Sequence, residues 1–240
     1  MDLRHHNEKK DTFSAARGFY MLFWMFILGS IAGFVLEGLW SLVRWGKWAH
    51  HAGVVWGPFC TIYGFGAVAI YLSASLASKR ERPQWQTLLV RFLVCALAGS
   101  VVEYLVSLFQ EIGFGSMSWD YSNQKYNLGG RISLGMTFVW GAIGILFMQC
   151  AYPAMHALIA RIHGHGGYIV TWLLIVFMCI NLTISAVAVR RWKERGENIP
   201  PKTMIGERID EKFNDNRMQD LFPNMQFCEP GSYSYEGHAA

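Results

Sequence analysis

Two glutamates, Glu37 and Glu103, stand inside long apolar stretches of this 240-residue chain. An ionised side chain at membrane depth costs about 2.5 to 3.5 kcal/mol on insertion scales, so such a residue is a candidate for function by default. A carboxylate in that position can bind a cation, exchange a proton, or join two helices through an ion pair. Arg91 is also charged, but it lies near a helix start and its side chain can reach the headgroups.

Further polar and aromatic residues complete a candidate substrate-binding set. They are Tyr63, Trp119, Asp120, Asn127 and Arg131. Most of them belong to the segment 113–130, which is too long and too aromatic for a simple connector. Asp120 could orient a cation or hydroxyl groups, or could cap a turn, and Trp119 could anchor the chain at the membrane interface. Arg131 opens a helix and could supply the counter-charge for a carboxylate.

The sequence indicates no catalytic group, no metal site and no cofactor. No nucleophile–base pair can be read from residue spacing, and His156, His163 and His165 do not have the spacing of a metal motif. No Gly-rich turn precedes a Lys-Ser or Lys-Thr pair, so the chain cannot bind ATP in that way. Basic clusters flank the apolar stretches, where they meet lipid headgroups rather than nucleic acid.

The elements that position these side chains are apolar helices. The chain is 52% hydrophobic and only 16% charged, which favours lipid as the solvent. A helix that crosses the hydrocarbon core needs about 20 predominantly apolar residues. Five stretches meet this requirement: 18–43, 54–76, 88–108, 132–152 and 168–189. The sequence therefore predicts an all-α fold, a polytopic transmembrane helical bundle of about five spans in the cell membrane.

Alternation of the spans predicts where the polar residues meet. The ends of the first and third spans share a membrane face with the starts of the second and fourth. Glu37 and Glu103 lie late in the first and third spans. Tyr63 and Arg131 lie early in the second and fourth spans. We therefore expect these residues and the 113–130 loop to gather on one side. Either a substrate or ion site or a structural ion-pair network would explain the cluster.

Small residues mark a second unusual segment at the start of the second span. Gly57-Pro58, Gly64 and Gly66 would allow a broken helix whose backbone faces a solute, or a tight turn followed by close helix packing. Gly130 occupies a similar position before the fourth span. We treat these five residues as a structural motif.

The chain divides into a polar N-terminal leader (1–17), a transmembrane helical domain (18–190) and a soluble, partly disordered C-terminal tail (191–240). One group of apolar residues recurs every four positions in the tail, namely Ile205, Ile209 and Phe213. This spacing predicts a short amphipathic helix on the membrane surface or on a partner. Beyond Pro201 we find no core-forming apolar run, and beyond Pro223 the composition is typical of disorder.

Together these stretches resemble a known family, the small bacterial membrane proteins named as ABC-transporter permeases of type IV. The matching motifs are GFVLE (33–37), GPFCTIYGFG (57–66), Glu103-Tyr104 followed by Glu111, WDYS (119–122) and NLGGRI (127–132). The resemblance covers residues 18–150. It implies a shared core formed by Glu37, Gly57, Pro58, Tyr63, Gly64, Glu103, Trp119, Asp120, Asn127, Gly130 and Arg131, without assigning their roles.

Three functions are compatible with these observations. The first is an integral membrane transport component, with a one-sided polar pocket for a small solute or ion, energised by a separate ATPase subunit or a gradient. The second is a membrane-embedded enzyme acting on a lipid-linked or amphiphilic substrate, in which a carboxylate of raised pKa serves as acid or base. The third is a structural or regulatory membrane subunit. Membrane lipids are partners in each case, and nucleic acid in none.

Overall fold

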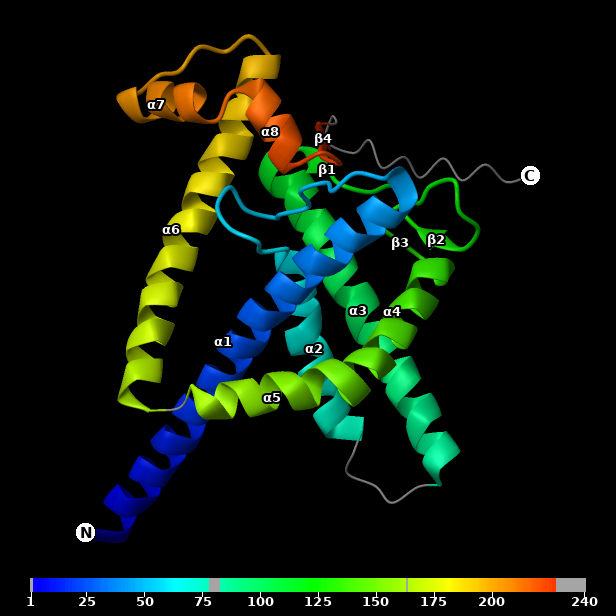
Figure 1. Cartoon of the computed structure of the whole chain (residues 1–240), viewed down its shortest axis with the longest axis vertical. Coiled ribbons are helices and arrows are strands. Elements are labelled where there is room, and N and C mark those ends of the chain that lie inside the picture. Colours follow the sequence, from blue (N-terminus) through cyan, green and yellow to red (C-terminus); the bar gives the residue numbers. More distant parts are fainter. Residues whose placement is uncertain (1, 78–82, 163, 228–240) are drawn as a thin grey trace.

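The computed structural model describes residues 2–77, 83–162 and 164–227 (Figure 1). Residues 78–82 of the basic connector, and residues 228–240, for which we expected disorder, lie outside this range. Eight α-helices are described: α1 (Asp2–Trp45), α2 (Thr61–Ala77), α3 (Gln84–Phe114), α4 (Leu134–Leu146), α5 (Tyr152–Arg161), α6 (His165–Gly196), α7 (Met204–Lys212) and α8 (Asp215–Leu221). The expected all-α class is confirmed.

The long apolar helices follow the hydropathy pattern of the sequence. Within the described residues, four helical segments are long and apolar enough to cross a membrane: Gly18–Trp45, Gln84–Phe114, Leu134–Arg161 and His165–Gly196. The remaining expected span corresponds to a shorter apolar helix, Thr61–Ser73. In Figure 1, α2 lies between α1 and α3, and α4 packs against α3.

The second helix starts seven residues later than position 54, where the apolar stretch begins. Gly57 has a φ of +80° and Pro58 follows it, so the chain turns here before it can form a helix. Val54 and Val55 are nevertheless buried. The backbone N–H of Val55 donates to Ser185 Oγ (2.9 Å), and the Asn181 amide bonds both backbone groups of Trp56. The sequence of this loop is therefore apolar because its side chains are buried. Side chains of α6 form hydrogen bonds with its backbone groups.

The fourth long helix changes direction in its middle. A π-helical turn, η1 (Phe147–Ala151), separates α4 from α5, and Pro153 lies in the first turn of α5. A widened turn and a proline are both recognised causes of helix bending. Figure 1 shows α5 crossing the lower part of the bundle instead of continuing the line of α4.

The C-terminal segment, as far as residue 227, packs on the helical bundle. The expected amphipathic helix is present as α7, with Thr203 accepting a capping hydrogen bond from the Gly206 N–H. Its apolar face, with α8, forms a core on α6 and the 53–60 loop. The buried members of this core are Val55, Ala188, Val189, Ile209, Phe213, Met218 and Phe222. The C-terminal segment thus attaches through four spaced apolar residues rather than through one apolar run. They are Ile209, Phe213, Met218 and Phe222.

Two short antiparallel strand pairs complete the fold beside the upper ends of α1 and α3 (Figure 1). Strands β2 (Asn127–Leu128) and β3 (Ile132–Ser133) form a hairpin directly before α4. Strand β1 (Ser116–Met117) follows α3 and pairs with β4 (Gln226–Phe227), far away in sequence. This second pairing holds the chain after α8 against the end of α3.

Candidate functional site

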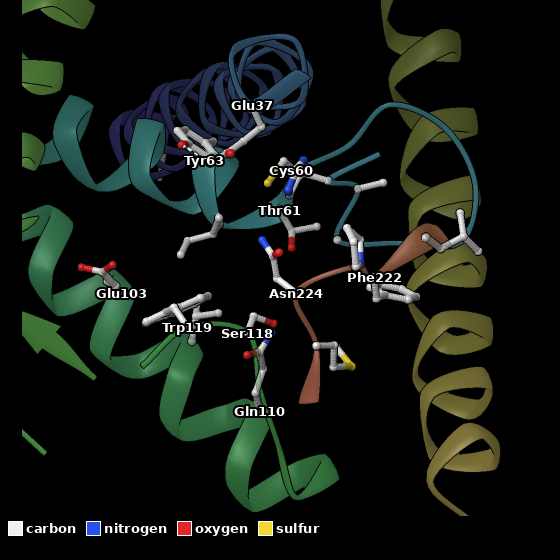
Figure 2. Close-up of a pocket in the computed structure, with 18 of the residues that line it drawn as sticks. Glu37, Cys60, Thr61, Tyr63, Glu103, Gln110, Ser118, Trp119, Phe222 and Asn224 are labelled. Atoms are coloured by element: carbon white, nitrogen blue, oxygen red, sulfur yellow. Dashed lines mark hydrogen bonds between the residues drawn. The ribbon is translucent and has the colours of Figure 1, made fainter. Parts of the chain in front are cut away.

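A cavity of about 330 Å³ opens where the upper ends of α1, α2, α3 and α4 meet the C-terminal segment. Figure 2 shows side chains of α1, α2, α3 and the C-terminal segment around it. One side is formed by Glu37, Tyr63, Glu103 and Trp119, and the opposite side by Phe222 and Asn224. Four of the residues predicted from sequence to bind substrate are therefore brought together, as alternation of the helices requires.

Glu37 is joined to α2 by a short hydrogen bond. The Tyr63 hydroxyl donates to Glu37 Oε1 over 2.6 Å. Tyr63 lies in the first turn of α2 and reaches α1 because Gly33, one turn before Glu37, leaves room for its ring. A Cβ on Gly33 would stand 2.3 Å from Tyr63 Cγ. The glycine of the GFVLE motif is thus required for the approach of these two side chains.

Glu103 is buried and accepts a hydrogen bond at each of its oxygens. The Tyr121 hydroxyl donates to Oε1 (2.9 Å) and the Trp140 indole N–H donates to Oε2 (2.9 Å). Burial, followed by the charge of Glu103 and the hydrogen bond to it, raises the pKa of Tyr121 above its ordinary value, so this hydroxyl stays protonated as a donor. Both donors are held by elements that flank the cavity.

Trp140 connects the two carboxylates. Its ring centroid lies 6.0 Å from that of Tyr63, at an interplanar angle of 50°, in the range of aromatic pairs. Gly99 of α3 allows the indole to lie against the helix, because a Cβ there would stand 2.6 Å from it. Glu37, Tyr63, Trp140, Glu103 and Tyr121 therefore form one continuous row, which we call the carboxylate–aromatic belt.

The charged groups that face the cavity are mainly acidic. Glu37 and Glu103 are carboxylates, and the neutral Gln110 amide and one histidine, His51, also line the cavity. The Gln110 side-chain oxygen is buried and has no hydrogen-bond partner among the described residues. No lysine or arginine belongs to the lining within the part of the chain that the structure describes. The cavity can thus accept hydrogen bonds and balance positive charge.

Arg131 does not line this cavity, although we expected it to be the counter-charge for Glu37, Glu103 or Asp120. Its guanidinium forms an ion pair with Glu111, two turns beyond Glu103 on α3. It also donates to Ser107 Oγ (3.2 Å) and lies over the Tyr104 ring. Glu103 instead accepts from the neutral donors Tyr121 and Trp140.

Asp120 and Asn127 shape the loop and do not belong to the cavity lining. Asp120 Oδ1 accepts from the backbone N–H of Ser122 (2.9 Å) and from its hydroxyl (2.6 Å), which is a turn-capping arrangement. Asn127 donates to the carbonyls of Ser122 and Gln124 and accepts from the Gly130 N–H. Of the two uses considered for Asp120, the geometry corresponds to the turn cap.

The loop in turn orients Trp119. Its indole N–H donates to the Arg131 carbonyl over 3.0 Å, which fixes the ring against the cavity. Gly130, with a φ of +67°, makes the turn that places this carbonyl. Arg131, Asn127 and Gly130 therefore act on the site through the positions of Trp119 and Tyr121.

The glycines of the second helix allow it to pack closely. A Cβ on Gly64 would lie 2.7 Å from the Phe26 carbonyl oxygen of α1, and one on Gly66 would lie 3.4 Å from the Trp140 ring. Gly57 and Pro58 form the turn before this helix, as described above. The geometry thus corresponds to the turn-and-packing alternative for these residues.

Several lining residues were not singled out from sequence. Trp140 lies in an apolar helix, and composition does not show which face of such a helix points inward. A buried indole N–H usually has a hydrogen-bond acceptor, and this could have indicated a polar partner for Trp140. Gln110 follows Glu103 and Ser107 on the same face of α3, so helical spacing alone could have indicated it. Phe222 and Asn224 reach the cavity only through the β1–β4 pairing.

The fold and the cavity define an all-α membrane protein that carries a cavity lined by two carboxylates at one end of its helices. The chain belongs to the family described as "Putative ABC-transporter type IV", whose model matches residues 24–186, more than half of the chain. The match includes the carboxylate–aromatic belt and ends before α7. It agrees with the resemblance carried by the sequence motifs and supports a membrane protein of transport type. Neither a curated protein nor a solved structure matches the chain.

Proposed function

We propose that this chain is an integral, multi-pass subunit of a transporter in the cell membrane, and that its cavity binds a small cationic solute. A separate ATPase subunit or an ion gradient supplies the energy. Membership of the transporter-type family and the four long apolar helices support the general role. The nature of the solute follows from the cavity.

The observation that carries this proposal is the imbalance of charge in the cavity. Glu37 and Glu103 line it together with one histidine, His51, and no lysine or arginine does so among the described residues. A pair of carboxylates withdrawn from bulk water is costly unless positive charge compensates it. A bound cation would provide that charge, whereas an anion would add to the repulsion.

The aromatic walls favour an organic cation. Tyr63, Trp119, Tyr121 and Trp140 surround the carboxylates, and aromatic faces attract ammonium groups by about 0.5 to 2 kcal/mol each. The buried Gln110 oxygen would accept a hydrogen bond from an N–H or O–H of the ligand. The site therefore suits an organic ammonium ion, in a volume typical of small-molecule sites.

The alternative is that the carboxylate–aromatic belt only fixes the helices. Each of its hydrogen bonds joins two different elements, which a structural network would also do. A structural network needs no ligand, so its removal would lower stability without changing what the protein binds. Identification of bound molecules separates the two cases.

The test is mass spectrometry of molecules that co-purify with the protein. The wild type is compared with a Glu37→Gln/Glu103→Gln double variant and with Asp120→Asn, which removes a carboxylate outside the cavity lining. We expect a cationic small molecule with the wild type and with Asp120→Asn, and its loss from the double variant. Recovery of the same molecules from all three proteins, or of an anion, would contradict the proposal.

A further inference from the structure

A second cavity of about 430 Å³ lies beside the first, between α1, α2 and the α4–η1 segment. Its walls are apolar and include Leu36, Ile70, Ile143, Leu146, Phe147 and Met155. Small residues such as Gly29 and Ala67 line it where α1 and α2 pack closely together. We call this space the apolar groove.

The apolar groove adjoins the polar cavity, because the two spaces share two lining residues. Tyr63 and Trp140 line both spaces, and both belong to the carboxylate–aromatic belt. Each ring therefore presents one part of its surface to the acceptors and another to the apolar groove. A molecule that passes these rings would meet carboxylates at one end and hydrocarbon at the other.

The apolar groove is also accessible from the lipid side. Leu36 is 47% exposed and Leu146 is 60% exposed, on helices long and apolar enough to lie in a membrane. Lipid tails are as apolar as leucine, so no hydrophobic driving force in the bilayer would close the helices over this space. A hydrocarbon chain is the occupant that matches such walls.

We propose that the substrate is a cationic amphiphile, namely an ammonium head bearing one alkyl chain. The head occupies the polar cavity near Glu37 and Glu103, and the chain lies in the apolar groove. This inference rests on the proposed function, because it takes the cavity to be a cation site. It adds that the substrate enters from the bilayer, with the Tyr63–Trp140 pair lying at the junction of head and chain.

The test uses two photoreactive probes on the protein in lipid nanodiscs. Both are dodecyltrimethylammonium derivatives, one with a diazirine at the end of the chain and one with a diazirine beside the ammonium group. We expect the chain-end probe to label peptides that contain residues 29–36 or 143–155, and the head probe to label the 113–130 loop. Unlabelled dodecyltrimethylammonium should compete with both, whereas dodecyl sulfate of equal chain length should not.

A matched pair of variants tests the location. Cys150 lines the apolar groove and Cys179 lies on α6 outside it, and both are exposed free cysteines. We expect Cys150→Trp to fill the space and lower chain-end labelling severalfold, while Cys179→Trp leaves it unchanged. Equal labelling of the two variants would overturn the inference.

The remaining outcomes distinguish this inference from the proposed function. If choline binds in a Glu103-dependent manner but the chain-end probe labels only other lipid-facing surfaces, the amphiphile is refuted and the cation site stands. If dodecyl sulfate competes as well as its cationic counterpart, the apolar groove binds alkyl chains regardless of the charge of the headgroup. That outcome also refutes a cationic amphiphile as the substrate. If neither choline nor the probes bind, both proposals fail.

Discussion

The indole N–H of Trp140 donates a 2.9 Å hydrogen bond to the carboxylate of Glu103, and both side chains are buried. Tyr121 supplies the donor for the other oxygen. An acidic residue on α3 is thereby accommodated by neutral donors from α4 and from the loop. Arg131, which we expected to be a counter-charge, is instead engaged by Glu111.

Replacement of Trp140 by Phe should destabilise the protein. The change keeps an aromatic ring but removes the donor, leaving one oxygen of a buried carboxylate without this partner, which typically costs about 1 to 3 kcal/mol. Thermal unfolding in detergent would measure the loss. Trp172→Phe is the matched control, because Trp172 is 65% exposed on α6 and should tolerate the change. Equal melting temperatures for the two variants would show that the hydrogen bond contributes little.

The Arg131–Glu111 pair should stabilise the loop without binding the ligand. Arg131→Met removes the counter-charge of a largely buried carboxylate and should cost about 3 kcal/mol or more. Adding Glu111→Leu should recover most of that loss, because an apolar pair often replaces a buried ion pair without penalty. A double-mutant cycle of unfolding free energies measures the coupling. Loss of cation binding in the stable double variant would place the pair in the ligand site.

Phe213 should be essential for the attachment of the C-terminal segment. It is 1% exposed and packs with Val55 and Ile209 in the core that joins this segment to the bundle. Phe213→Ala should lower the free energy of unfolding by about 3 to 5 kcal/mol and make the segment sensitive to protease. Ile205→Ala on the neighbouring α7 is the control, since Ile205 is 68% exposed. Proteolysis at the same rate in both variants would refute a structural role.

Asp210 predicts a pH dependence of stability. Hydrogen bonds from Arg191 lower the pKa of Asp210 below its ordinary value of 3.8, against the opposing effect of partial burial, and Arg195 adds to the lowering. A carboxyl group whose pKa is lower in the folded state stabilises that state above its unfolded pKa. This contribution disappears as the pH falls through the folded pKa.

The melting temperatures of the wild type and Asp210→Asn should therefore differ most at neutral pH and begin to converge only below about pH 4, as the pH falls towards the folded pKa of Asp210. Asp220→Asn, an exposed change on α8, should match the wild type at every pH. A difference between wild type and Asp210→Asn that is independent of pH would mean that shape, rather than charge, makes the contribution.

Much of the fold could be predicted because membrane helices are specified by local composition. Alternation of the spans was sufficient to predict that Glu37, Tyr63, Glu103 and Trp119 lie at one end of the bundle. The start of α2 could not be placed, because residues 53–60 are apolar for burial against α6 and not for helix formation. Hydropathy does not distinguish these two reasons.

The partners of charged groups were harder to predict than their level in the membrane. Glu103 and Glu111 lie on the same face of α3, and only the positions of Tyr121 and Trp140 decide which of them pairs with Arg131. The contribution of Phe222 and Asn224 depends on strand pairing across more than a hundred residues of sequence. Such long-range contacts leave no signal in local periodicity.

The central claim is that Glu37 and Glu103 bind a cation in the cavity. Glu103→Gln is the informative change, because an amide can accept from Trp140 with its oxygen and donate to the Tyr121 oxygen with its nitrogen. The hydrogen bonds can thus survive while the charge is lost. Trp119 and Trp140 line the cavity, so occupancy should change the fluorescence of two of the chain's ten tryptophans.

The decisive measurement is a fluorescence titration of the protein in nanodiscs with choline and related ammonium ions, accompanied by thermal unfolding of each variant. We expect a saturable signal for the wild type and for Asp120→Asn, and at least about a tenfold weaker affinity for Glu103→Gln, corresponding to about 1.4 kcal/mol, with its melting temperature retained. Absence of a saturable signal in the wild type, or undiminished affinity in Glu103→Gln, would contradict the cation site. A parallel fall of stability and binding would assign the carboxylate–aromatic belt to structure alone.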